Sequence, residues 1–242
     1  MVTHIAHAYG NSRELLARAL AAPIDVIEAD VRYGQGELWI RHERRLGPLP
    51  VLADRRHGHG PPGPFAMRLY RGYYLRLDVQ RFTVSELIGS VAGKKRLLLD
   101  LKSCKDAEAP DFALALTREI RTAGATGWVA VCGQFWAVLN SLRRQAPEIE
   151  VRYSIERRDQ WERYTQIAER GEGARRICIE HRFLDDVRLS CLKELGADIY
   201  CWTVDDPAEA AALVARGVDG IISNDLPLLA GLRASGGLTS RS

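Results

Sequence analysis

The chain has 242 residues, of which 46% are hydrophobic and 27% are charged, a composition typical of a globular protein with a large core. Its formal net charge of +3 is too small to indicate a nucleic acid partner by itself. No apolar run reaches the length of a membrane span, so we expect no stable membrane insertion.

Short apolar runs alternate with amphipathic stretches along most of the chain. The apolar runs predict strands at residues 3–8, 25–32, 37–42, 96–102, 128–132, 150–155, 176–181, 198–204 and 220–223. The amphipathic stretches predict helices at residues 12–22, 83–92, 109–123, 134–145, 158–170, 185–195 and 207–216. The last of these helices has clear boundaries, because Pro207 follows Asp206 at its start and Gly217 lies just beyond its end.

This alternation favours an α/β fold built on a parallel sheet. If segment 37–42 is the return arm of the second strand unit, eight strands remain, and eight units of roughly thirty residues fit a (β/α)8 TIM barrel. An open doubly wound sheet is the alternative, although the chain carries no glycine-rich phosphate or dinucleotide fingerprint. We therefore predict a single barrel domain over residues 1–235 and a disordered tail at 236–242.

A long insertion at residues 44–81 follows the second strand unit. It begins with prolines and glycines, includes His57 and His59, which we expect in a solvated loop, and then alternates arginines with tyrosines and a leucine. These alternating residues are Arg68, Tyr70, Arg71, Tyr73, Tyr74, Arg76, Leu77 and Arg81. Loops of this length within a domain are usually functional. The insertion is either a lid for a phosphate-bearing or lipid-like substrate, or a subdomain that packs its tyrosines on the barrel.

Two acidic residues lie in the otherwise apolar strand predicted at 25–32. Glu28 and Asp30 point to the same face, because side chains two residues apart share a face of a strand. Two buried carboxylates are costly unless a cation meets them, so the pair indicates a metal ion. The alternative is an acidic face that is solvated or paired with arginines.

More polar residues fall at or near the ends of other predicted strands. The set comprises His7, His42, Asp100, Lys102, His181 and Trp202. The carboxyl ends of barrel strands carry the active site in TIM-barrel enzymes. We therefore expect these residues to lie together with Glu28 and Asp30.

The five cysteines are an odd number without a C-x-x-C spacing, which favours reduced and buried thiols over a disulfide framework. The first predicted strand begins almost at Met1 and leaves no room for a signal peptide. We therefore expect a cytoplasmic protein.

Several segments combine into a recognisable order. IAHAYG, IEADV and RHE contain His7, the Glu28 and Asp30 pair, and His42 with Glu43. TVSELIGSVAGKKRLLLDLK follows them, and CWTVDDPAEAAALVARGVDGIISNDLP lies near the carboxyl end. In their order, spacing and closing motif, these segments resemble the glycerophosphodiester phosphodiesterase family across nearly the whole chain.

Three features depart from the pattern of that family. Ala8 and Tyr9 follow His7 where members usually carry Arg-Gly, the usual Pro-Glu-Asn-Thr segment is absent, and Asp100 stands where members usually carry Glu. The short first loop and the Asp-x-Lys strand are similar to the related sphingomyelinase D group. These differences bear on the substrate more than on the chemistry, and the arginines of the insertion are candidates to replace the missing phosphate contact.

The resemblance implies a metal-dependent site for phosphodiester cleavage. Glu28, Asp30 and Asp100 offer hard oxygen ligands that suit one divalent cation, Mg²⁺ or Ca²⁺. His7 and His42 would then form the general acid and base pair.

The remaining candidates would contact the substrate or support the histidines. Lys102 would place a positive charge against the phosphoryl group. Trp202 is either a pocket wall that stacks on the substrate or a core tryptophan, and His181 either touches the substrate or has a structural role. Glu43 is a candidate to orient a histidine.

The reaction that the resemblance implies is hydrolysis of a small-molecule glycerophosphodiester to sn-glycerol 3-phosphate and an alcohol. A first alternative is a lysophospholipase D or sphingomyelinase D-like enzyme that releases a cyclic phosphate. A second alternative is a catalytically inactive barrel that acts as a binding module. Against the second, an inactive barrel has no energetic reason to keep so many polar residues buried together.

Overall fold

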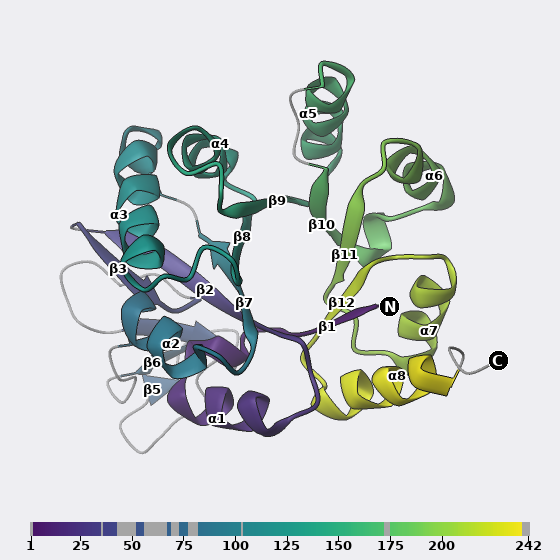
Figure 1. Cartoon of the computed structure of the whole chain (residues 1–242), viewed down its shortest axis with the longest axis horizontal. Helices are drawn as coiled ribbons and strands as arrows, with labels where there is room; N and C mark the ends of the chain where they lie inside the picture. The colour runs from purple at the N-terminus through teal and green to yellow at the C-terminus, as the bar shows by residue number, and fades with distance from the viewer. Residues whose placement is uncertain are drawn as a thin grey trace.

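Eight parallel strands close into a barrel in this computed structural model, and helices surround it (Figure 1). The structure describes residues 2–34, 36–42, 52–55, 67–68, 73–76, 82–102, 104–171 and 175–238. In order around the barrel the strands are β1 (Thr3–Ala6), β2 (Val26–Gly34), β7 (Arg96–Leu101), β8 (Val129–Gly133), β9 (Glu150–Ile155), β10 (Arg176–Glu180), β11 (Asp198–Trp202) and β12 (Gly220–Ser223). β1 pairs with both β12 and β2, which closes the barrel and confirms the predicted (β/α)8 fold.

Helices connect the barrel strands and pack around their outer face (Figure 1). They are α1 (Arg13–Ala21), α2 (Val84–Val91), α3 (Ala109–Thr122), α4 (Trp136–Gln145), α5 (Arg158–Glu169), α6 (Asp186–Glu194), α7 (Pro207–Ala215) and α8 (Leu226–Leu238). Short 3-10 helices are η1 (Tyr9–Asn11), η3 (Asp106–Glu108) and η4 (His181–Phe183).

Local sequence signals explain several of these boundaries. The Thr83 hydroxyl accepts a hydrogen bond from the Glu86 backbone N–H at the start of α2, while the Glu86 carboxylate accepts one from the Thr83 backbone N–H. This capping box satisfies two donors that the first helical turn leaves free. Asp206 caps α7 before Pro207, and Gly217 adopts a φ of +83° after its end, so both predicted boundaries of that helix are confirmed.

Some predicted elements differ from those observed. The strand expected at 3–8 ends at Ala6, so His7 lies in the turn before η1, and the strand expected at 176–181 ends before His181, which begins η4. Segment 37–42 forms β3 (Glu37–Ile40), which returns antiparallel to β2 as expected for the arm of that unit.

α8 was not predicted, and it includes residues 236–238, which we expected in the tail. Asp225 begins this helix, since its Oδ1 accepts a hydrogen bond from the Leu228 backbone N–H at 3.0 Å. Leu228 and Leu229 are buried, so packing against the barrel holds a helix whose glycines disfavour it locally. The remaining tail residues, 239–242, lie outside the described residues.

Part of the insertion forms a small antiparallel sheet rather than the irregular segment that we expected. Its strands are β4 (Leu52–Arg55), β5 (Met67–Arg68) and β6 (Tyr73–Arg76), in the order β4-β6-β5. The predicted lid residues Tyr70, Arg71, Leu77 and Arg81, together with His57, His59 and Glu43, lie outside the described residues. Within the described part of the chain, no helix is long and apolar enough to cross a membrane.

The barrel has a filled interior. Its side chains form a cluster of apolar residues from seven of the strands, namely Ile5, Val26, Leu98, Ala130, Cys132, Cys178, Tyr200 and Ile222. The larger core lies between the outer face of the barrel and the helices. This cluster fills the middle of the barrel, below the carboxyl ends of the strands, where TIM barrels carry their active sites.

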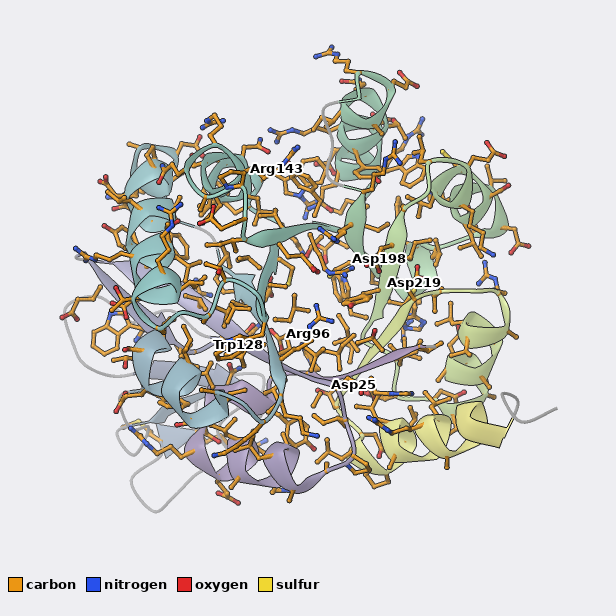
Figure 2. The ribbon with its side chains drawn as sticks, in the orientation of Figure 1. Asp25, Arg96, Trp128, Arg143, Asp198 and Asp219 are labelled. Atoms are coloured by element: carbon orange, nitrogen blue, oxygen red, sulfur yellow. The ribbon has the colours of Figure 1, made fainter. Side chains whose placement is uncertain are left out.

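An ion-pair network lies at the opposite, amino-terminal end of the barrel. Arg152, only 1% exposed, donates a bidentate pair of hydrogen bonds to Asp198 and a further one to Glu150, and its guanidinium stacks 3.4 Å above the ring of Tyr200. Figure 2 views this end, with Arg96, Asp198 and the other labelled strand-start residues around the barrel axis.

Candidate active site

Three carboxylates from two neighbouring strands meet at the carboxyl end of the barrel. β2 carries Glu28 and Asp30 on its inner face, and the parallel register places Asp30 directly beside Asp100 of β7. Ligand atoms of all three lie within 4.8 Å of one another. Glu28 and Asp30 are 3% and 1% exposed, and Glu28 Oε1 is a buried atom without a hydrogen-bond partner among the described residues.

The electrostatics of these acids favour a bound cation. Burial, together with the charges of Asp30 and Asp100, raises the pKa of Glu28 well above its usual range. For Asp30, burial acts in the same direction, but the charge of Lys102, its hydrogen bond to Asp30 and the two nearby histidines together outweigh burial and lower the pKa to about 2. Three clustered oxygen ligands, one without a partner, fit a hard divalent cation.

Lys102 lies against the acids. Its Nζ is 2.6 Å from Asp30 Oδ1 and contacts Asp100 Oδ2. Burial favours the neutral amine, yet the charges of Asp100, Asp30 and Glu28 outweigh it and raise the pKa of Lys102. The side chain therefore carries a positive charge at the site at neutral pH.

His7 is oriented by a chain of hydrogen bonds from the end of β12. Its Nδ1 lies 2.8 Å from Asn224 Oδ1, while Asn224 Nδ2 donates to Asp205 Oδ2 at 2.7 Å. Burial raises the pKa of Asp205, but hydrogen bonds from Asn224 and Ser223 lower it more, so this carboxylate stays ionised and accepts. The amide nitrogen of Asn224 therefore faces Asp205 and its oxygen faces His7, which leaves Nδ1 as the donor and Nε2 as the basic nitrogen.

His42 reaches the site from the segment after β3. Its side chain lines the pocket, and its carbonyl oxygen accepts hydrogen bonds from Arg32 Nε at 2.9 Å and Arg32 Nη2 at 2.5 Å. The arginine thus holds the backbone of His42 close to the strand that carries the acids.

Asn11 holds Asp30, the second of the three clustered acids, and was not predicted. The Asn11 amide donates to Asp30 Oδ2 at 2.5 Å and accepts from the Asp30 backbone N–H at 2.8 Å. Ala8 similarly donates its backbone N–H to Glu28 Oε2 at 2.5 Å, in a left-handed conformation with a φ of 59°. The short first loop, noted from the sequence, is what brings both groups onto β2.

A pocket of about 300 Å³ lies over these groups. Its lining combines the predicted residues with others from the next strands, namely His7, Glu28, His42, Asp100, Lys102, Cys132, Gln134, Ser154, Glu156, Cys178, Trp202, Thr203 and Ile222. Trp202 is thus a wall of the pocket. His181 is not in this lining, and its Nδ1 lies 3.5 Å from Glu209 Oε1.

Two of the residues that sequence reasoning missed had a detectable signal. Asn224 falls in the closing motif GVDGIISNDLP, and Asn11 ends the short first loop. The wall residues Gln134 and Glu156 follow β8 and β9 without any distinctive pattern.

The chain was compared with known proteins. The model of the glycerophosphoryl diester phosphodiesterase family matches residues 6–227. Glycerophosphodiester phosphodiesterase GDPD4 of Arabidopsis thaliana is 23% identical over 93% of this chain and 69% of that protein.

Solved structures share the fold. A glycerophosphodiester phosphodiesterase from Parabacteroides distasonis superposes with a TM-score of 0.72 at 18% identity, covering 98% of each chain. An Oleispira antarctica phosphodiesterase in complex with the product sn-glycerol-3-phosphate superposes with a TM-score of 0.68 at 19% identity, covering 96% of each chain. With the family match over most of its length, the chain belongs to the glycerophosphoryl diester phosphodiesterase family and is a hydrolase of phosphoric diesters.

Proposed function

We propose that the chain hydrolyses glycerophosphodiesters to sn-glycerol 3-phosphate and an alcohol, with the help of one divalent cation, Mg²⁺ or Ca²⁺. The observation that carries this proposal is the convergence of three carboxylates, two histidines and one lysine at a single pocket. The product bound to the Oleispira antarctica relative supports the substrate class.

Glu28, Asp30 and Asp100 would hold the cation. When bound, a divalent cation neutralises a nonbridging phosphate oxygen and stabilises the negative charge of the transition state. Lys102, already charged beside the same carboxylates, would bind a second phosphate oxygen.

The two histidines would move the protons. His7 Nε2 is the basic nitrogen, so it accepts the proton of the attacking hydroxyl, whether that belongs to water or to the substrate glycerol. His42, which also lines the pocket, would donate a proton to the oxygen of the leaving alcohol. Asn224 would keep the resulting imidazolium of His7 in place, because its oxygen still accepts from Nδ1–H.

A phosphorus NMR time course tests this proposal. Glycerophosphocholine and lysophosphatidylcholine are incubated with the protein and Mg²⁺ or Ca²⁺, and then with a chelator. The expected result is a metal-dependent phosphomonoester signal from glycerophosphocholine. A cyclic phosphate from lysophosphatidylcholine would instead support the sphingomyelinase D-like reaction, and no turnover of either would support the binding module.

Two variants connect the result to the site. His42→Ala should abolish turnover with little change in melting temperature, because the side chain is exposed. Asp100→Asn should lose the rise in melting temperature that Mg²⁺ or Ca²⁺ gives the parent protein, which reports metal binding independently of activity. Retained turnover in His42→Ala would contradict the assignment.

A further inference from the structure

The charges that line the pocket are unevenly divided between its two sides. The side formed by β1, β2, β3 and β7 carries the acids of the metal site and every positively charged or histidine side chain in the lining, namely His7, His42 and Lys102. The opposite wall follows β8 to β11 and consists of Gln134, Ser154, Glu156, Cys178, Trp202 and Thr203. Among the described lining residues, this wall therefore has one charge, which is negative.

Glu156 is held firmly at the end of β9. Its backbone N–H donates to Gln160 Oε1 at 2.8 Å, and Gln160 is 5% exposed. Its carboxylate lies 2.9 Å from Arg157 Nη1, but the Arg157 side chain is 53% exposed and also pairs with Asp159. An exposed ion pair of this kind contributes little to stability. The Glu156 carboxylate can therefore give up its pair with Arg157 and bind a cationic group in the pocket instead.

Trp202 adds an aromatic surface to the same wall. It ends β11 and lines the pocket, and its Nε1 is buried without a hydrogen-bond partner among the described residues. An indole attracts a cation to its face, most strongly where water is excluded, and it suits methylated ammonium groups in particular. The free N–H is at the same time available to an oxygen of the ester.

Arg157 Nη1 pairs with Glu156 and donates to Gln134 Oε1 at 3.5 Å, so the wall has a compensating charge while that exposed side chain stays in place. Where Arg157 moves away, the carboxylate faces an anionic phosphodiester, which is unfavourable unless the substrate brings a positive charge of its own. Within the proposed function, on which this inference rests, we propose that the pocket selects diesters whose alcohol carries an ammonium group. Glu156 pairs with the ammonium and Trp202 covers its apolar side, while the phosphate lies over the metal-site acids and Lys102.

A matched pair of substrates tests this selectivity. Glycerophosphocholine is compared with the diester of glycerol phosphate and 3,3-dimethylbutanol, in which a carbon atom replaces the ammonium nitrogen at the same size. The parent protein should cleave the choline diester with a kcat/KM about tenfold higher, the effect of about 1.4 kcal/mol. Glu156→Gln should remove this preference by lowering kcat/KM for the choline diester while leaving the uncharged diester within about twofold.

Asp159→Asn is the matched control, since Asp159 shares Arg157 with Glu156, is 71% exposed and does not line the pocket. It changes the net charge by the same amount and should keep the preference. Melting temperatures establish that both variants are folded, and inhibition by free choline, compared with free 3,3-dimethylbutanol, should weaken only in Glu156→Gln.

The outcomes of these assays distinguish a failure of the selectivity from a failure of the proposed function. Equal cleavage of the two substrates by the parent protein, or an equal loss for both in Glu156→Gln, overturns the selectivity while leaving the phosphodiesterase proposal intact. No metal-dependent cleavage of either diester overturns the proposed function and the selectivity with it.

Discussion

At the residue scale, two side chains of the candidate site, His7 and Asp30, are each held by an asparagine. The hydrogen bond between His7 and the Asn224 side-chain oxygen determines which ring nitrogen of His7 carries the proton. Asn11 forms hydrogen bonds with both the side chain and the backbone of Asp30. Hydrogen-bond partners of this kind set the orientation of the side chains that they contact.

Asn224→Ala should lower kcat about 10- to 100-fold with a smaller change in KM. Without the amide oxygen, nothing selects the tautomer of His7 in which Nε2 is basic, so the acidic limb of the pH–rate profile should shift as well. The control is Tyr9→Phe, because the Tyr9 hydroxyl donates to the Asn224 carbonyl at 3.1 Å without touching its amide. An unchanged pH profile in Asn224→Ala would show that the residue has only a structural role.

Glu28→Gln should make the metal-free protein more stable at neutral and alkaline pH. Because the pKa of Glu28 is raised in the folded state, the unfolded chain releases its proton first, above about pH 4.3, and the folded state loses stability as pH rises. Asp30, with its pKa lowered to about 2, acts in the opposite sense and loses its contribution only in acid.

Urea unfolding with a chelator at pH 5 and pH 8 measures the Glu28 effect. The gain from Glu28→Gln should be larger at pH 8, whereas the exposed Glu14→Gln should change stability little at either pH. A variant less stable than the parent at both values would contradict the charge argument. Stabilisation by Mg²⁺ or Ca²⁺ should be lost in the same variant.

At the scale of elements, the closest approach is that of η1 to β2. A Cβ built on Gly10 would lie 2.5 Å from the Ala29 Cβ and 3.1 Å from the Glu28 carbonyl oxygen, so the turn fits only because residue 10 is glycine. This contact brings Ala8 and Asn11 onto the acids of β2.

Gly10→Ala should therefore destabilise the protein by about 1–3 kcal/mol through overpacking and weaken metal binding as η1 moves away from β2. Gly89→Ala is the matched control, because Gly89 is exposed within α2 and a Cβ there meets nothing within 4 Å. That change should stabilise by about 0.5–1 kcal/mol. Urea unfolding and a metal titration followed by melting temperature measure both effects, and equal results for the two variants would contradict the packing argument.

The strands and most helices were predictable because their local patterns agree with the fold. Pro207 and Gly217 marked the ends of α7 before any packing was known. α8 escaped prediction because its glycines and small residues give a weak local signal, and its buried leucines matter only once the barrel is present.

At the scale of the whole molecule, the two ends of the barrel differ in what they contain. The carboxyl end carries the pocket, while the amino end carries Arg152, buried and paired with Asp198 and Glu150. Mutations at the amino end should therefore affect stability and leave turnover per folded molecule unchanged.

Arg152→Met should destabilise the protein by about 2–3 kcal/mol, because it removes charge-assisted hydrogen bonds to Asp198 and Glu150, whose carboxylates are partly exposed. The same substitution at Arg158, whose side chain is 86% exposed, should cost less than about 1 kcal/mol. Urea unfolding measures both, and the kcat of the protein that remains folded should equal that of the parent. A loss of kcat in a fully folded Arg152→Met protein would contradict the separation of the two ends.

The sequence by itself determined the class of fold, the acids of β2 and β7, both histidines and Lys102, because these depend on strand periodicity and on motifs that lie close together in the chain. It did not determine the partners of those residues. The pairing of His7 with Asn224 joins positions 217 residues apart, and it exists only because β1 and β12 meet when the barrel closes.

The wall of the pocket was likewise decided by tertiary structure alone. Gln134, Glu156 and Trp202 follow three different strands, and no local pattern shows that their side chains face the same space. Barrel closure sets which strand ends face one another across the pocket, so the part of the site expected to choose the substrate becomes visible only in three dimensions.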